Sequence, residues 1–179
     1  LIDPDKQEVA TLAKLIQKAV NCGVDYFFVG GSLLTKPIDP VVLACKKHSS
    51  IPVVIFPGNG AQLSAHADAV LFLSLLSGRN PEYLIGQQVQ AAPFVKQIGI
   101  EVVPTAYILI DGGNVSSVEY ISNTKPIPAN KADIVVATAL AGAYLGMQAI
   151  YLEAGSGASR AVPADVVAAV KAETQSPLI

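Results

Sequence analysis

The stretch QAIYLEAGSGASRAVPADVVAAVKAETQSPLI, residues 148–179, contains one strand–loop–helix unit and the start of another strand. Residues 148–153 form a short apolar run that predicts a strand, and residues 163–174 have the apolar spacing of a helix. A further apolar run begins at residue 176. A strand, a helix and a second strand in this order predict two parallel strands joined by a helix.

The same alternation recurs along the whole chain. Runs that predict strands lie at residues 1–3, 25–31, 51–58, 67–76, 100–110, 148–153 and 176–179. Helical patterns lie at residues 7–20, 40–48, 81–99, 131–147 and 163–174, and residues 111–130 form a long polar segment. Seven strand starts alternating with helices favour an α/β fold, a (β/α)8 TIM-like barrel. A doubly wound open sheet is the alternative, but no GxGxxG follows the first strand.

Length and composition indicate how much of a barrel the chain contains. With 51% hydrophobic residues, the 179 residues are enough for one sizeable core. A complete barrel takes about 250 residues, and the sequence ends inside an apolar run. We therefore expect residues 1–179 to be a single barrel domain without its last strands and helices, part of a longer protein that is incomplete at the N-terminus as well.

Charge and composition argue against several functions. The net charge is −2 and there is no basic run, so nucleic acid is not an expected partner. The longest apolar runs are far shorter than the roughly 20 residues that cross a bilayer. Cys22 and Cys45 lie in helix-like segments without a CxxC motif. We expect both to be buried, reduced thiols of a cytoplasmic protein.

Local signals predict where two helices begin. Asp39 followed by Pro40, and Asn80 followed by Pro81, have the pattern of a capping residue and a proline in the first turn. Pro93 is expected to bend or interrupt the second of these helices.

Three oxygen-bearing side chains are predicted at the carboxyl ends of strands, where barrel enzymes place their working residues. Asp3 ends the first strand, Ser32 ends the second, and Glu153 ends the sixth. For Asp3, which precedes Pro4, a helix cap or turn is an equally good interpretation. Three such groups at one predicted rim favour a functional site.

The stretch AGSGAS, residues 154–159, follows Glu153 directly. Gly155 and Gly157 allow successive backbone N–H groups to point at one anion, and Ser156 offers a hydroxyl. A flexible surface loop is the alternative. We predict that the loop wraps a phosphate and that Glu153 is the general base for a hydroxyl of the same molecule.

The residues needed for several other catalytic mechanisms are absent from the sequence. His48 and His66 are far apart in the sequence, so we expect solvated histidines and neither a metal pair nor a catalytic triad. There is no GxSxG, P-loop, HExxH or DDxxD motif.

Several motifs together resemble one enzyme family. They are LIDPDK, DYFFVGGS, FLSLLSGRNPEYLIGQQ, VVPTAYILIDGG, SNTKPIPANK and YLEAGSGAS, and they cover the chain in order. The set resembles the geranylgeranylglyceryl phosphate synthase family of (β/α)8-barrel prenyltransferases, which is related to the heptaprenylglyceryl phosphate synthases. The long AGSGA loop is more similar to the second group of this family.

The resemblance implies a Mg²⁺-dependent transfer of a geranylgeranyl or other prenyl chain from its diphosphate to the 3-hydroxyl of sn-glycerol 1-phosphate. Diphosphate is released and the ether bond of glycerol-based membrane lipids forms. Asp3 and Ser32 would bind the metal. The glycerol 1-phosphate site would comprise Tyr151, Leu152, Glu153, Ala154, Gly155, Ser156 and Gly157. A lysine that precedes the DP motif in the bacterial branch is Leu1 here, so that contact is not carried over.

The resemblance also implies a homo-oligomer and allows a transient contact with a membrane surface. Two other functions fit the residues. One is a different sugar-phosphate-handling TIM barrel, an isomerase or lyase, and the other is a non-catalytic phospholigand-binding barrel.

Overall fold

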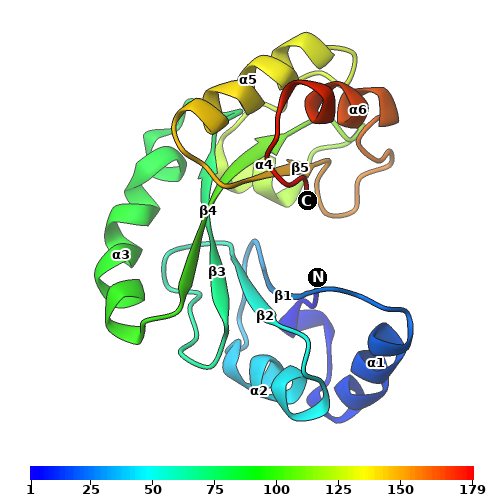
Figure 1. The fold of residues 1–179 in the computed structure, drawn as a ribbon, viewed down its shortest axis with the longest axis vertical. Helices are drawn as coiled ribbons and strands as arrows, with labels where there is room; N and C mark the ends of the chain where they lie inside the picture. Colours follow the sequence, from blue (N-terminus) through cyan, green and yellow to red (C-terminus); the bar gives the residue numbers. More distant parts are fainter. The chain divides into compact units, whose positions relative to one another are not determined.

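The computed structural model describes residues 1–179 except for the side chains of residues 9 and 10. Its strands are β1 (Phe27–Gly31), β2 (Val53–Pro57), β3 (Ala69–Leu75), β4 (Glu101–Leu109) and β5 (Ala149–Glu153). They follow one another in one sheet in the order β1-β2-β3-β4-β5 (Figure 1). The pairs β1–β2, β2–β3 and β4–β5 are parallel. The predicted parallel α/β fold is therefore confirmed.

Helices connect most of these strands, because a parallel pair needs a long crossover rather than a hairpin. They are α1 (Val9–Asn21), α2 (Asp39–His48), α3 (Gln87–Ile98), α4 (Ser117–Ser122), α5 (Ala132–Tyr144) and α6 (Ala164–Glu173). A short 3-10 turn, η1 (Pro4–Lys6), and a π-helical segment, η2 (Glu82–Gly86), complete the elements. The described chain between β2 and β3 contains only turns and bends, as predicted.

The chain divides into two compact units. Unit 1 contains Leu1–Leu71 and Gln90–Val102, and unit 2 contains Phe72–Val89 and Val103–Ile179. Strands β3 and β4 contribute residues to both units.

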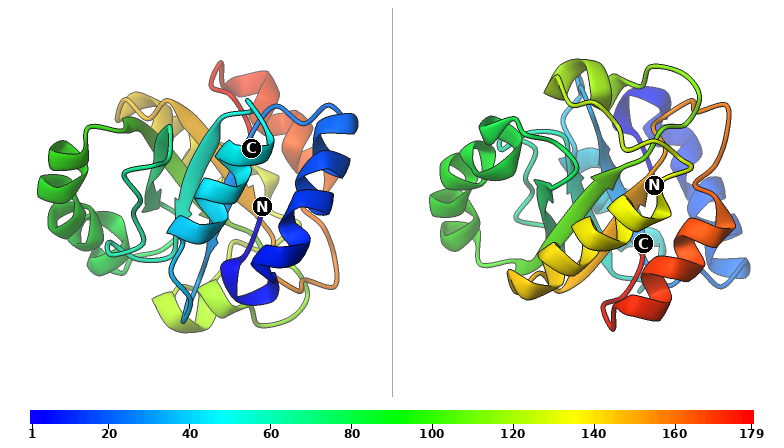
Figure 2. Two further views of the ribbon diagram at one scale, coloured as in Figure 1. Left: turned by 90° about the horizontal axis from the view of Figure 1, so that it is seen from below. Right: turned by 90° about the horizontal axis from the view of Figure 1, so that it is seen from above.

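Unit 1 is built around β1 and β2, with α1 and α2 side by side (Figures 1 and 2). Leu12 and Ile16, from the predicted apolar stripe of α1, are completely buried. The expected first strand is reduced to one parallel bridge, between Ile2 and Val29. The backbone N–H of Ile2 donates to the carbonyl of Phe28 at 2.7 Å, and this fixes the residue after Ile2 beside the end of β1.

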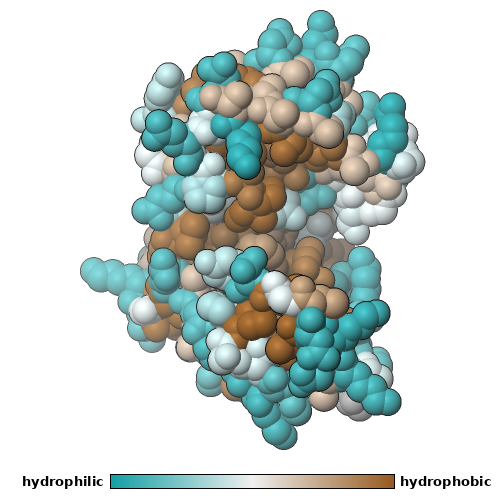
Figure 3. Space-filling view, turned by 45° about the vertical axis from the view of Figure 1, so that its right-hand side comes forward, coloured by the Kyte–Doolittle hydropathy of each residue, from teal (hydrophilic) through white to brown (hydrophobic). Residues whose placement is uncertain are grey.

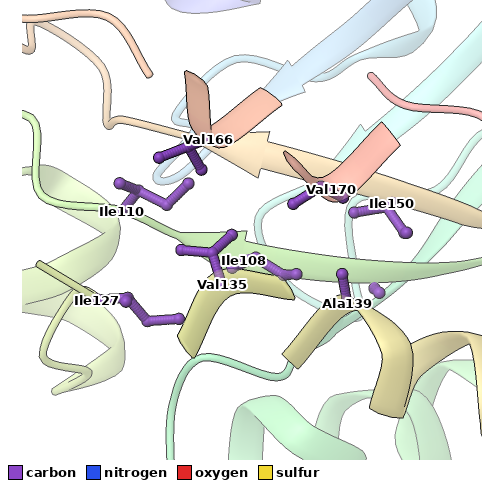
Figure 4. Packing of buried hydrophobic residues seen from close by; sticks show 9 residues of the cluster. Ile108, Ile110, Ile127, Val135, Ala139, Ile150, Val166 and Val170 are labelled. Atoms are coloured by element: carbon purple, nitrogen blue, oxygen red, sulfur yellow. The ribbon is translucent and has the colours of Figure 1, made fainter. Parts of the chain in front are cut away.

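Unit 2 has its core where α5 and α6 pack on β4 and β5 (Figure 4). Ile108, Ile150 and Val135 are completely buried there. Burial of each such side chain stabilises the fold by roughly 1.5–3 kcal/mol. Helix α5 approaches β4 closely at Gly142, where an added Cβ would lie 2.7 Å from the Cβ of Ala106. This core holds the ends of β4 and β5, and therefore the loops that follow them.

The last residues of the chain continue the sheet beyond β5. Leu178 forms a parallel bridge with Ile150, and the N–H of Ile150 donates to the carbonyl of Pro177 at 2.9 Å. The strand predicted to begin at residues 176–179 is thus present as one bridge beside β5, like the first strand beside β1.

Two predicted helix caps differ from the observed ones. Asp39 is not an N-cap: the helix begins one residue earlier than expected, Ile38 takes the cap position, and Asp39 lies in the first turn. Its carboxylate still favours the positive end of the helix dipole from there. Asn80 does not take the cap position either, since Pro81 does, but its Oδ1 accepts from the N–H of Glu82 at 3.1 Å.

Three further details differ from expectation. Pro93 lies inside α3 and does not interrupt it, so only the expected bend stays a prediction; the irregular π-helical turn comes earlier, in η2. The polar segment 111–130 contains the short helix α4, which was not predicted. Cys22 is exposed at the end of α1, so the prediction of two buried thiols is wrong for this residue and correct for Cys45.

The surface mixes polar and apolar side chains. Hydrophilic groups cover much of the face shown in Figure 3, and hydrophobic side chains gather there in patches. Within the described part of the chain, none of the helices combines the length and the apolar character needed to span a bilayer.

Candidate active site

In unit 1, Asp3 lies beside the end of β1. Its Oδ1 accepts from the N–H of Asp5 at 3.0 Å and so caps the η1 turn, and its Oδ2 lies 3.2 Å from Nζ of Lys6. The capping role anticipated as an alternative for Asp3 is therefore real. It leaves the carboxylate partly exposed, with 22% of the side chain accessible.

The carboxylate of Asp3 packs against Gly31, the residue before Ser32. A Cβ added to Gly31 would lie 3.4 Å from both Cγ and Oδ2 of Asp3. Gly58, after β2, approaches the same place: its added Cβ would lie 2.2 Å from the carbonyl oxygen of Gly31. Glycine is thus required at residue 58, and the structure brings Asp3 close to the segment that carries Ser32.

Asp5 holds the loop that follows Ser32. Its carboxylate accepts from the N–H and Oγ1 of Thr35 at 2.9 and 3.2 Å and from the N–H of Lys36 at 2.8 Å. These hydrogen bonds, with the charge of Lys36, lower the pKa of Asp5. Sequence reasoning missed this residue, because a carboxylate in DPDK gives no sign of a partner 30 residues away.

The residues present here fit a magnesium ion held mainly by substrate. Among the described residues there is no cluster of three His, Cys, Asp or Glu side chains suited to a metal. His48 and His66 are both exposed, as expected. The donor set at the end of β1 is one carboxylate and a nearby hydroxyl-bearing residue. Mg²⁺ commonly takes one or two carboxylates and completes its shell with phosphates and water.

In unit 2, Glu153 ends β5, and its carboxylate is largely buried. Its Oε1 accepts from the N–H of Gly155 at 2.6 Å, and Tyr151 also hydrogen-bonds the carboxylate. Burial raises the pKa of Glu153, and these two hydrogen bonds only partly offset that rise. A carboxylate with a raised pKa is a stronger base than an exposed glutamate.

Two tyrosines lie near Glu153, and one of them, Tyr151, hydrogen-bonds its carboxylate. The rings of Tyr107 on β4 and Tyr151 on β5 meet edge to face with centroids 5.5 Å apart. Burial first, and the charge of Glu153 second, raise the pKa of Tyr151 to about 12 and that of Tyr107 well above its ordinary value. Both phenols stay protonated at neutral pH. Tyr107 was not predicted, because its alternation with core residues in β4 resembles packing alone.

The glycine-rich loop has the geometry of an anion-binding turn. Gly155 and Gly157 adopt φ values of 100° and 77°, which other residues rarely adopt. The N–H of Ala158 donates to the carbonyl of Gly155 at 3.1 Å and closes the turn. Within the described chain, the backbone N–H groups of Ser156 and Gly157 have no hydrogen-bond acceptor. They are available to a ligand.

The loop after β4, residues 111–116, packs directly on the glycine-rich loop. A Cβ added to Gly112 would lie 2.2 Å from the carbonyl oxygen of Ala154, and one added to Gly155 would lie 2.4 Å from Cβ of Ser116. The carbonyl of Gly112 also accepts from Oγ of Ser159 and from the N–H of Arg160, both at 3.0 Å. The two loops form one surface.

A separate hollow lies on the outer side of α5. It encloses about 540 Å³ and is lined by Leu76, Arg79, Asp133, Ile134, Ala137, Thr138 and Ala141. None of the predicted site residues lines it, so we do not assign the chemistry there.

Comparison with known families decides the relationship. The profile of the PcrB family matches residues 1–179. The chain belongs to the PcrB family. A curated PcrB relative, the geranylgeranylglyceryl phosphate synthase of Chitinophaga pinensis, is 49% identical over 180 residues, which cover all of this chain and 71% of that protein. The predicted family resemblance is confirmed.

Solved PcrB structures agree with the fold. GGGPS from Thermoplasma volcanium matches with a TM-score of 0.92 and 35% identity over 99% of this chain and 71% of that one. The (S)-3-O-geranylgeranylglyceryl phosphate synthase of Thermoplasma acidophilum, solved with its substrate sn-glycerol-1-phosphate, matches with a TM-score of 0.92 and 34% identity over 98% and 71%. The prediction of the barrel fold of this family is thereby confirmed, and the names of the relatives support the prediction of a prenyltransferase.

The roles of individual residues stay predictions. The structure groups Asp3 with the segment that carries Ser32 in unit 1, and it groups Tyr151, Glu153 and the glycine-rich loop in unit 2.

Proposed function

We propose that this PcrB-family chain is a Mg²⁺-dependent prenyltransferase that joins a geranylgeranyl or similar diphosphate to the 3-hydroxyl of sn-glycerol 1-phosphate. One observation carries the proposal: at the end of β5, the acid Glu153 lies next to a turn with free backbone N–H donors. The family profile matches all 179 residues of a chain with this arrangement. That combination suits a substrate that carries both a phosphate and a hydroxyl.

The phosphate of glycerol 1-phosphate would bind the glycine-rich loop. The N–H groups of Ser156 and Gly157 and the hydroxyl of Ser156 provide donors without a charged side chain. The remainder of the segment from Tyr151 to Gly157 would orient the glycerol backbone.

Glu153 would take the proton of the attacking hydroxyl. The hydroxyl oxygen forms a bond to C1 of the prenyl chain while the bond from C1 to the diphosphate oxygen breaks. The bonding electrons leave with diphosphate, and the hydroxyl proton moves to Glu153. Because burial raises its pKa, Glu153 is a stronger base than an exposed glutamate would be. Its contact with Tyr151 would hold the carboxylate toward the substrate.

Asp3 and Ser32 would hold the metal together with the diphosphate. The bound ion would supply charge neutralisation for the departing diphosphate. Asp5 would keep the Ser32 loop in place through its bonds to Thr35 and Lys36.

The direct test is product formation with the full-length protein. Labelled sn-glycerol 1-phosphate and geranylgeranyl diphosphate should give a Mg²⁺-dependent, organic-soluble ether, and glycerol 3-phosphate should be a poor substrate. Prenyl diphosphates of other lengths form the comparison series. No ether product with any prenyl length would reject the proposal. Turnover of a sugar phosphate without a prenyl donor would favour an isomerase or lyase.

Assembly and location belong to the same proposal. We expect a cytoplasmic homo-oligomer that contacts a membrane surface transiently when its lipid product leaves. Exposed apolar side chains such as Tyr144 and Leu145, which are 84% and 73% accessible, would suit such contacts. Size-exclusion chromatography with light scattering tests the assembly.

A further inference from the structure

Asn114 joins the two loops of unit 2 with both ends of its carboxamide. Its Nδ2 donates to the carbonyl of Gly157 at 3.1 Å, and its Oδ1 accepts from the N–H of Ser159 at 2.9 Å. The side chain therefore bonds the backbone of two residues, Gly157 and Ser159, in the way that one residue of a neighbouring β-strand would. It spans 43 and 45 positions of sequence to do so.

This bidentate contact lies directly after the free donors of the glycine-rich loop in the sequence. The bonded groups belong to Gly157 and Ser159, and the turn closed by Ala158 and Gly155 overlaps them. Gly155 and Gly157 of this turn adopt positive φ, and glycine has more conformational freedom to lose on ordering than any other residue. The Asn114 side chain fixes two backbone groups of the turn. It therefore lowers the conformational entropy that the turn would otherwise lose when a ligand binds.

We propose that Asn114 is a positioning residue for the phosphate of the acceptor substrate, an inference that rests on the proposed function. Asn114 does not contact the phosphate. It sets the separation and direction of the Ser156 and Gly157 N–H groups before the ligand arrives. Its effect falls on the affinity for the phosphate-bearing substrate and not on the proton transfer to Glu153.

Two substitutions separate the donor from the acceptor. Asn114→Ala removes both bonds. Asn114→Asp keeps an acceptor for the N–H of Ser159, loses the donor to Gly157, and adds a negative charge beside the expected anion. Asn130→Ala is the matched control, because Asn130 is an exposed loop residue of the same unit whose side chain makes no hydrogen bond within the described chain.

The expected result is a split between kinetic constants. For Asn114→Ala we expect Kd and KM for sn-glycerol 1-phosphate to rise about three- to tenfold, consistent with losing neutral hydrogen bonds of modest net strength. KM for the prenyl diphosphate, kcat and Tm should stay at the wild-type values. Asn114→Asp should weaken binding further, and Asn130→Ala should match the wild type. Inorganic phosphate, measured by calorimetry, should show the same order.

Hydrogen exchange tests the inference without any turnover. In the ligand-free protein, amides of residues 154–160 should exchange faster in Asn114→Ala than in the wild type or in Asn130→Ala. Unchanged exchange there, or unchanged Kd, would overturn the role of Asn114 while leaving the proposed function intact. A wild-type protein that binds neither glycerol 1-phosphate nor inorganic phosphate would overturn the proposed function and this inference together.

Discussion

The two units place an acid at the end of a strand in different surroundings. In unit 1, the carboxylate of Asp3 is partly exposed, lies beside the ammonium of Lys6 and accepts one backbone N–H. In unit 2, Glu153 is also only partly accessible, but its partners are neutral: a backbone N–H and a phenol. The first setting suits an ionised ligand for a cation, and the second suits a base that must take up a proton. The same functional group is thus given two tasks by its surroundings.

The most severe test of this contrast is Glu153→Gln. We expect activity to fall roughly 10²- to 10⁴-fold, the range for loss of a positioned general base. Glutamine keeps an acceptor for the N–H of Gly155, so the affinity for glycerol 1-phosphate should be retained. Steady-state rates and calorimetry measure the two effects, with Glu101→Gln, an exposed residue, as the control.

The stability of Glu153→Gln sharpens the same point. Because the pKa of Glu153 is higher in the folded chain than in the unfolded one, its ionised form destabilises the fold at pH values above both. The variant should therefore have a higher Tm than the wild type at neutral pH. The difference should disappear as the pH falls below the pKa of the unfolded chain. A Tm difference that grows toward acid pH would contradict the assigned burial.

Unit 2 also depends on its core. Ile108→Ala should lower the free energy of unfolding by about 2–5 kcal/mol, because Ile108 is completely buried beneath α5. Urea unfolding measures the change. Ile134→Ala, on the exposed side of α5, should have little effect. Equal losses in the two variants would show that the packing in Figure 4 is not the source of stability.

In unit 1, Asp3→Asn should reduce kcat/KM roughly 10²- to 10³-fold, as is typical when one preorganised electrostatic contact is removed. The Mg²⁺ concentration for half-maximal activity should rise, while Kd for glycerol 1-phosphate should not change. Asp25→Asn, at an exposed position, is the control. If Asp3→Asn instead weakened the binding of glycerol 1-phosphate, the assignment of Asp3 to the metal and diphosphate would be wrong.

The smallest expected effect is a shift in a pH profile. Tyr151 hydrogen-bonds Glu153 and lowers its pKa, so Tyr151→Phe should raise that pKa further. Because the base acts when deprotonated, the acid limb of the kcat profile should move to higher pH. Tyr120→Phe, at an 82% exposed tyrosine, should leave the profile unchanged. If the acid limb of Tyr151→Phe moved to lower pH instead, Tyr151 would not be the group that lowers the pKa of Glu153.

Sequence patterns predicted the regular parts of the fold well, because the spacing of apolar residues along a segment indicates which of its faces is buried. The runs at 25–31 and 148–153 contain β1 and β5, and the helix expected at 163–174 is α6 within one residue at each end. The short helix α4 was missed, although Ser116 and Glu119 have the spacing of a capping pair and the N–H of Glu119 does donate to Oγ of Ser116.

The parts of the site that could not be predicted depend on segments far apart in the sequence. Glu153 and the glycine-rich loop were identified because their residues are contiguous. The contacts of Asp5 with Thr35 and of Asn114 with Ser159 span 30 and 45 positions, and only a folded chain reveals them. Tyr107 was not predicted, because the sequence does not distinguish a site tyrosine in a buried strand from a tyrosine that only packs in the core.

The central claim is that the turn after β5 binds the phosphate of glycerol 1-phosphate next to Glu153. A crystal structure of the full-length protein with sn-glycerol 1-phosphate tests it most directly. We predict that phosphate oxygens accept from the N–H groups of Ser156 and Gly157 and that the 3-hydroxyl points at the carboxylate of Glu153. A phosphate bound elsewhere, with these N–H groups facing solvent, would contradict the account.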